Sequence, residues 1–240
     1  MLTILNKNMN NNQQIPGAII FAGVLIAGAI LLKGGQVVEL PSKQPEPIED
    51  SIKREYAGLD RADTGLDRTL GNAQTDVIVI EYGDFQCPFC GMFFRDTEGV
   101  IIDKYVRTGK VKFVYRDFAF LGPESIKAAL AARCAGDQGK FWEYHDYLFS
   151  HQNGENQGAF ADPNLKSFAR TLRLNTSMFG QCFDSLKHHQ EILDSLDLGK
   201  NSGVKGTPKG FILKDGKIVD TIDGAEPTSM VTDKIEKALK

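Results

Sequence analysis

The sequence contains few cysteines and histidines, four of each among 240 residues. Only Cys87 and Cys90 are close together, and none of the histidines stands at a metal-ligand spacing from a cysteine. A structural zinc site normally needs a second close pair of ligands, so we expect no bound metal, and nothing in the sequence calls for an organic cofactor. The net charge is only −3, which gives no indication of a nucleic-acid partner.

Long apolar runs are also scarce, and one of them has the length of a membrane span. Residues 15–32 form an uncharged run of 18 residues. As a helix this run would be about 27 Å long, close to the thickness of the hydrocarbon core of a bilayer. A cleaved signal peptide is the alternative, but the apolar run continues past the small residues Ala27-Gly28-Ala29. We expect a tail over residues 1–14 and a transmembrane anchor over residues 15–33.

Residues 34–67 have the composition of a tether. Pro41, Pro45 and Pro47 interrupt the segment, and it is too polar for a long coiled coil. The tetrapeptide at residues 58–61 recurs at residues 65–68, but two copies do not indicate a repeat architecture. We expect the folded domain to occupy residues 68–240.

The pattern within this domain mixes strands and helices. An apolar strand over residues 76–82, a helix over 88–107 and an alternating strand over 110–115 predict a right-handed parallel crossover. Helices are expected over residues 123–135, 141–149, 163–172 and 177–195. Asp215-Gly216 between two apolar runs predicts a hairpin, and residues 227–240 a final helix.

Cys87-Pro88-Phe89-Cys90 is the motif that points to chemistry. It stands where the predicted helix begins, and free amide donors and the helix dipole favour a thiolate at that position. Such a setting lowers a cysteine pKa from roughly 8.5 into the range of roughly 3.5–7.5. A purely structural disulfide over so short a loop would constrain the unfolded chain very little. The spacing therefore predicts a redox-active pair.

The order of elements and several motifs resemble the thioredoxin fold, and in particular the membrane-tethered branch of the DsbA-like thiol–disulfide oxidoreductases of bacterial envelopes. The resemblance covers residues 67–240. It rests on residues 70–72, residues 82–90 around the two cysteines, residues 134–145, and Gly206-Thr207-Pro208. It implies an α/β thioredoxin-like fold with a helical insert over about residues 123–203, preceded by one transmembrane helix.

The resemblance also implies roles for individual residues. Cys87 would be the attacking thiol and Cys90 the resolving one, with Pro88 and Phe89 between them. Thr207-Pro208 would form a cis-proline loop facing the disulfide. Glu81 would be a buried acid that exchanges a proton with Cys90; the alternative is an ordinary solvated strand end.

The chain departs from the best-known oxidants of this family at two positions. Phe89 replaces a histidine, so a hydrogen-bond donor to the thiolate is missing. Lys209 follows the proline in place of a smaller polar residue, and we expect it to add positive charge near the site.

The leading hypothesis is an oxidase that introduces disulfides into exported proteins. It requires substrates with thiols, an integral-membrane partner that re-oxidises it, the bilayer through residues 15–32, and an extracytoplasmic catalytic domain. A disulfide isomerase or reductase on the same fold is the alternative, and a non-catalytic tethered binding protein is a third. Outside the cytoplasm, Cys134 and Cys182 are expected to form a structural disulfide rather than to remain two separately buried thiols.

Overall fold

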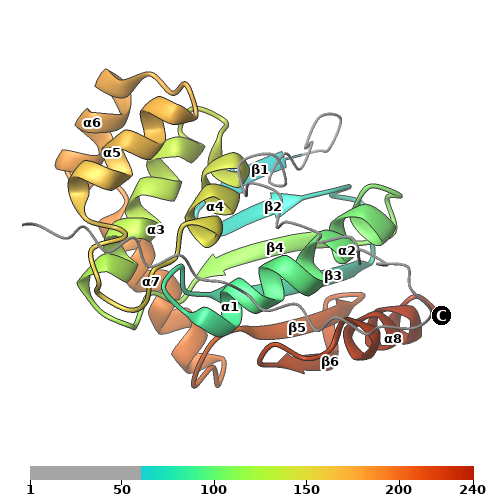
Figure 1. Cartoon of the computed structure of the whole chain (residues 1–240). Helices are drawn as coiled ribbons and strands as arrows, with labels where there is room; N and C mark the ends of the chain where they lie inside the picture. Colours follow the sequence, from blue (N-terminus) through green and yellow to red (C-terminus); the bar gives the residue numbers. More distant parts are fainter. Residues whose placement is uncertain (1–60) are drawn as a thin grey trace, which may run out of the picture. The chain divides into compact units, whose positions relative to one another are not determined.

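The computed structural model describes residues 61–240 (Figure 1). The predicted tail, the predicted anchor at residues 15–33 and most of the predicted tether lie outside the described residues. Within residues 61–240, no helix is both long enough and apolar enough to cross a bilayer.

The centre of the fold is a six-stranded sheet in the order β1-β2-β4-β3-β5-β6. Its strands are β1 (Arg61–Thr64), β2 (Asp67–Leu70), β3 (Val77–Gly83), β4 (Lys112–Asp117), β5 (Lys209–Lys214) and β6 (Lys217–Asp223). Strand β3 pairs in parallel with β4 and antiparallel with β5. The predicted parallel crossover is therefore confirmed, and β3 lies in the interior of the sheet, where its Val and Ile side chains are buried on both faces except for the half-buried Ile78.

The sheet begins before the predicted domain boundary at residue 68. Strands β1 and β2 form a hairpin around Gly65, which has a φ of 53°, and β2 pairs with β4. Residues 61–67 were assigned to the tether because both strands are short and mostly polar, without the apolar run that marks β3. Their pairing is determined by the partner strand rather than by local sequence.

The helix that carries the cysteine motif is not a uniform α-helix. It consists of α1 (Pro88–Phe93), a π-helical turn η1 (Phe94–Glu98), α2 (Gly99–Ile101) and a second π-helical turn η2 (Ile102–Val106). The predicted helix over residues 88–107 therefore has the right extent. The π turns rotate the side chains that follow, and the apolar periodicity of the sequence did not indicate them.

A helical insert separates β4 from β5. It contains α3 (Pro123–Gly136), α4 (Phe141–Ser150), α5 (Asp162–Thr171), α6 (Thr176–Asp184) and α7 (His189–Asn201). In Figure 1, α3 to α6 gather beside one end of the sheet. The single helix predicted over residues 177–195 is wrong, because Leu186 has a φ of 55° and the N–H of Lys187 donates to the carbonyl of Cys182. This pattern terminates α6 before α7 begins.

The C-terminal elements follow the prediction closely. Asp215 and Gly216 have φ values of 50° and 74°, so both central residues of the β5–β6 turn lie in the left-handed region. A two-residue hairpin turn of this kind follows the twist of the strands, which explains the Asp-Gly dipeptide. The final helix, α8 (Thr228–Ala238), packs against β5 and β6.

The two faces of the sheet are covered by different helices. Alternate residues of β3 point to opposite faces. Ile80 and Tyr82 belong to a small core cluster with Phe118 and Phe211, to which Leu196 of α7 contributes. Val79 belongs to the larger cluster, which also contains Tyr115 and the cysteine pair. By this alternation, Glu81 lies on the same face as Val79. This face is covered by the helix that begins with α1 and carries the cysteine motif, called the cysteine helix below.

A buried ion pair connects the insert to the sheet. Arg133 of α3 is fully buried, and its Nε donates to Oδ2 of Asp117, at the end of β4, over 2.7 Å. Its Nη1 donates to Oε2 of Glu191, in α7, over 2.8 Å. The two helices and the strand are therefore joined by one guanidinium group, which suits arginine because its donors point in several fixed directions.

Candidate redox active site

Cys87 stands at the junction of β3 and α1. It has the extended backbone of an N-cap residue, with φ −69° and ψ 119°, and Pro88 occupies the first helical position. A proline is suited to this position because its missing N–H would have no partner within the helix. The carbonyl of Cys87 accepts the N–H of Gly91 over 3.1 Å, which closes the first turn.

The two cysteines are free thiols in this structure and are both buried. Cys90 has no exposed surface, whereas Cys87 retains 5%. The outer sulfur is therefore the one that another protein can reach, which agrees with the roles that the family resemblance implies for the two cysteines.

The structure gives the two thiols opposite acidities. The pKa of Cys87 is lowered to about 6, chiefly because the Cys90 thiol donates a hydrogen bond to it. Burial opposes this effect, whereas hydrogen bonding with Thr207 and with the N–H groups of Cys90 and Phe89 adds to it. The pKa of Cys90 is raised well above its ordinary value of 9.0, chiefly by burial and then by the neighbouring Cys87. At neutral pH Cys87 is therefore a thiolate and Cys90 a thiol.

The proline loop lies against the outer sulfur. The Thr207-Pro208 peptide bond is cis, as expected from the sequence, and the carbonyl oxygen of Thr207 lies 3.3 Å from Sγ of Cys87. Pro208 immediately precedes β5, which pairs with β3, so the register of the sheet brings the loop to the cysteine motif. This placement gives an incoming peptide a backbone edge beside the reactive sulfur.

Glu81 is buried, with 2% of its surface exposed, which excludes the alternative of a solvated strand end. It pairs with Gly210 of β5 and with Tyr115 of β4 in the register of the sheet. Its negative charge contributes to the raised pKa of Cys90, after burial and Cys87. The carboxylate is therefore electrostatically coupled to the resolving thiol.

Lys209 does not add a free positive charge to the site. Its ammonium group forms an ion pair with Asp223 of β6, which lies directly opposite in the β5–β6 register. The sequence did not indicate this partner, because the partner strand could not be aligned from the sequence alone. Phe89, by contrast, is 58% exposed and forms part of the surface at the motif.

A polar network holds the loop before Cys87, and no motif in the sequence indicates it. Oδ1 of Asp84 accepts the N–H of Gln86 over 2.9 Å and the hydroxyl of Ser125 over 2.7 Å. Its Oδ2 accepts the N–H groups of Phe120 and Leu121, over 2.9 and 3.1 Å. Burial nevertheless raises the pKa of Asp84. The only local indication of this role is the spacing of Asp84 and Gln86, because an aspartate often accepts the backbone N–H of the residue two positions later.

The insert also reaches the motif directly. Nε2 of Gln152, which follows α4, donates to the carbonyl oxygens of Phe85 and Cys87 over 2.7 and 3.0 Å. The side chain lines a cleft of about 420 Å³ beside Pro88. Because 65 positions separate Gln152 from Cys87, no local pattern in the sequence could indicate this contact.

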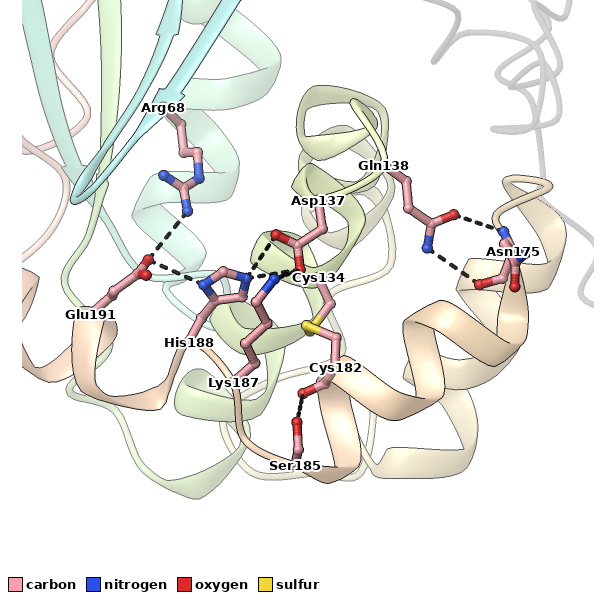
Figure 2. Close-up of a disulfide and its surroundings, with 10 residues drawn as sticks. All are labelled: Arg68, Cys134, Asp137, Gln138, Asn175, Cys182, Ser185, Lys187, His188 and Glu191. Carbon is pink, nitrogen blue, oxygen red and sulfur yellow. Dashed lines mark hydrogen bonds and ion pairs between the residues drawn. A yellow bond between two sulfur atoms is a disulfide. The ribbon is translucent and has the colours of Figure 1, made fainter.

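Cys134 of α3 and Cys182 of α6 form a disulfide, the pairing expected from the sequence (Figure 2). Beside it, Nε2 of His188 lies 3.0 Å from Oδ2 of Asp137. Figure 2 shows the His188 ring between Asp137 and Glu191, so α3, α6 and α7 are joined by the disulfide and by polar side-chain contacts.

Two groups of possible metal ligands occur within the described residues, Glu98–His145–Asp146 and Asp137–Cys182–His188. Their ligand atoms lie within 4.8 Å of one another in each group. The sequence spacing indicated neither group. In the second, the sulfur of Cys182 is already bonded to Cys134.

Comparison with known proteins agrees with this geometry. A family model described as thioredoxin matches residues 63–234. The chain is 32% identical over 152 residues to the Na(+)/H(+) antiporter NhaA 1 of Salinispora arenicola; the match covers 62% of the chain but only 22% of that protein. It is 28% identical over 174 residues to disulfide bond formation protein D of Bacillus subtilis, covering 71% of the chain and 76% of that protein.

The crystal structure of oxidised BdbD from Bacillus subtilis has the same fold. It superimposes with a TM-score of 0.63 at 25% identity, over 71% of this chain and 91% of that one. The predicted thioredoxin-like α/β fold with a helical insert is therefore confirmed.

Proposed function

Since this chain belongs to the thioredoxin family, we propose that it is a thiol–disulfide oxidoreductase that introduces disulfides into exported proteins through Cys87 and Cys90. The observation that carries the proposal is the pairing of a Cys87 thiolate, with a pKa of about 6, with a buried Cys90 thiol at the same helix N-terminus. The name of the relative disulfide bond formation protein D supports this activity, and the similarity to the BdbD structure supports the fold on which it depends.

The oxidising reaction begins from the Cys87–Cys90 disulfide. A substrate thiolate attacks Sγ of Cys87, the sulfur–sulfur bond breaks, and Cys90 leaves and takes up a proton. Glu81, on the same face of the sheet, supplies that proton when it is itself protonated, and as a carboxylate it accepts the proton of Cys90 in the reverse step. A second substrate thiolate then attacks the substrate sulfur of the mixed disulfide and releases Cys87. The substrate loses two electrons and two protons; one proton is gained by Cys90, the other goes to solvent, and Cys87 remains a thiolate.

The low pKa of Cys87 determines the direction of this exchange. A thiolate that is stable at neutral pH is a good leaving group, so the second step is fast. Its stabilisation also favours the reduced enzyme, which makes the enzyme disulfide the stronger oxidant. Re-oxidation then requires an external acceptor of two electrons, for which an integral-membrane partner is proposed.

The catalytic domain is proposed to lie outside the cytoplasm, anchored through residues 15–32. The apolar run in the sequence and the Cys134–Cys182 disulfide support this location, because disulfides persist outside the reducing cytoplasm. Carbonate extraction of membranes and protease protection of spheroplasts test both parts. A soluble product that begins near Ile30 would show that the run is a cleaved signal instead.

The activity is tested by mixing the oxidised protein with a reduced peptide that carries two thiols and following formation of the peptide disulfide. Cys87→Ala should abolish the reaction, and Cys90→Ala, offered the same peptide in its disulfide form, should accumulate the mixed disulfide that Cys87 forms by attacking that disulfide. If the wild-type protein instead reduces or rearranges disulfides faster than it forms them, the reductase or isomerase alternative replaces this proposal. Absence of all three reactions would favour a non-catalytic tethered protein.

A further inference from the structure

We infer that Gln152 is a positioning residue for Cys87, and that through it the helical insert controls the acidity of the reactive thiol. The inference rests on the proposed function, since it concerns the same redox centre. Gln152 touches no sulfur. It acts on the backbone from which the Cys87 side chain projects.

The amide group of Gln152 holds the active-site loop at two points. Its nitrogen has two N–H groups, and Nε2 donates to the carbonyls of both Phe85 and Cys87, over 2.7 and 3.0 Å. The two acceptors flank Gln86 on either side. A single side chain therefore fixes the orientation of two peptide groups, the one between Phe85 and Gln86 and the one between Cys87 and Pro88.

The Cys87 carbonyl is the important acceptor. It belongs to the peptide group that joins Cys87 to Pro88, and its direction depends on the ψ angle of Cys87. A hydrogen bond that holds the carbonyl therefore also holds this angle. The same carbonyl accepts the N–H of Gly91 over 3.1 Å as the first bond of the helix. The N–H groups of Phe89 and Cys90 lower the pKa of Cys87, and their aim at the sulfur depends on this turn. Fixing the carbonyl therefore holds these two donors in place, and they add to the larger contributions of the Cys90 thiol and Thr207.

Gly91 provides an independent sign of the same contact. A Cβ at this position would lie 2.2 Å from Oε1 of Gln152. Glycine is an unfavourable residue within a helix, and alanine is the best one. The missing side chain at residue 91 is what leaves room for the Gln152 amide beside the first helical turn.

The neighbouring loop residues strengthen the connection to the insert. The N–H of Asn156 donates to Oε1 of Gln86 over 2.6 Å, and Nε2 of Gln86 donates to the hydroxyl of Ser125 over 2.8 Å. Gln86 is thus held by insert residues at both ends of its amide. These bonds fix the loop as a whole, whereas the Gln152 bond reaches the reactive residue itself.

The test compares Gln152→Met with wild type. Methionine has a similar length but no N–H donor, so it keeps the volume and removes both hydrogen bonds. We expect the Cys87 pKa, read from thiolate absorbance, to rise, and the equilibrium with glutathione to shift about threefold to tenfold toward the enzyme disulfide. Gln157→Met is the matched control, because Gln157 is an exposed residue of the same loop that donates only to Glu155; both values should stay within twofold of wild type.

Gly91→Ala tests the contact from its other side. The new methyl group displaces the Gln152 amide, so the pKa of Cys87 should rise although the helix gains a better helix former. In a Gln152→Ala background there is no amide to displace, and Gly91→Ala should then leave the Cys87 pKa unchanged. Circular dichroism and an intact Cys134–Cys182 disulfide verify that each variant is folded.

Two results would overturn the inference: an unchanged Cys87 pKa and glutathione equilibrium in Gln152→Met, or a Gly91→Ala effect of equal size with and without Gln152. The pKa measurement needs no substrate. If wild type failed to oxidise the dithiol peptide while Gln152→Met still raised the pKa, the proposed function would fail and the positioning role would stand.

Discussion

The sulfur of Cys87 lies 3.3 Å from the carbonyl oxygen of Thr207, although the two residues are 120 positions apart. The sulfur lies between β3 and α1, and the carbonyl lies in the segment that leads into β5. A peptide joined to Cys87 as a mixed disulfide is therefore brought beside the backbone of Thr207, which can pair with it as an added strand.

Cys87 should react with alkylating reagents along a pH profile with a midpoint near its pKa of about 6, while Cys90 stays unmodified. Only the thiolate is nucleophilic, and the Cys90 pKa is raised by burial. Limiting reagent followed by peptide mapping measures both. In Cys90→Ala the Cys87 midpoint should move to higher pH, because the hydrogen bond from Cys90 is the largest cause of the low pKa. Preferential labelling of Cys90 would reverse the proposed roles.

The stability of the reduced protein should depend on pH through the same thiol. The pKa of Cys87 is lower in the folded protein, about 6, than its ordinary value of 9.0. The resulting stabilisation is fully present above about pH 9 and is lost as the pH falls toward 6. Urea unfolding of the reduced and oxidised forms should therefore show that the reduced form loses stability relative to the oxidised form across this window. A constant difference between the two forms would contradict the low pKa.

Phe89→His should lower the Cys87 pKa and make the pair more oxidising. Phe89 is exposed at the N-terminus of α1, where an imidazole can donate a hydrogen bond to the thiolate and phenylalanine cannot. Each pKa unit corresponds to about 1.4 kcal/mol, or about 30 mV for a two-electron couple. Thiolate absorbance and titration against glutathione measure the two effects. Met92→His, at another exposed position of α1, is the control and should change neither value.

Glu81→Gln should slow the step in which Cys90 gains or loses its proton. The buried carboxylate lies on the cysteine-helix face of β3, and removing an acid–base group of this kind slows proton transfer by about 100-fold or more. Stopped-flow oxidation of a dithiol peptide should show the defect at neutral pH, with partial recovery at alkaline pH. Asp76→Asn, at an exposed carboxylate just before the same strand, should behave as wild type. Equal rates for Glu81→Gln and wild type would remove Glu81 from the mechanism.

Replacing Cys134 and Cys182 together with alanine should destabilise the domain by about 4 kcal/mol in the chain-entropy model for a loop of 48 residues. Denaturant unfolding of the oxidised protein measures this loss. The Cys87 pKa should stay near 6, because the disulfide lies in the insert, between α3 and α6. An unchanged free energy of unfolding would mean that the disulfide constrains little.

Much of this architecture was visible in the sequence because it is encoded locally. The apolar run of β3, the Asp215-Gly216 turn and the cysteine motif each carry their own signal, and the structure has the elements that they predicted. The break between α6 and α7 was missed because Leu186 is not a residue that normally adopts a positive φ. Strands β1 and β2 were missed because their pairing depends on β4 rather than on their own composition.

The parts of the site that could not be predicted are those that depend on distant pairing. The ion pair of Lys209 with Asp223 follows from the strand register, and the Gln152 bond follows from how the insert packs on the motif. Neither has a spacing that identifies it in the sequence. The cysteine pair and the cis Thr207-Pro208 bond could be named in advance, whereas the residues that hold them in place could not.

The guanidinium of Arg133 also has a consequence for shortening the protein. The insert is often viewed as an addition to a complete smaller domain, but here its first helix neutralises Asp117, a carboxylate at the end of a central strand. Excising residues 123–203 would leave that carboxylate without its counter-ion, and replacing Arg133 alone would leave it buried and unpaired, a change that costs about 3–5 kcal/mol. A minimal version of this domain therefore has to change Asp117 as well, because the sheet itself depends on the insert for charge balance.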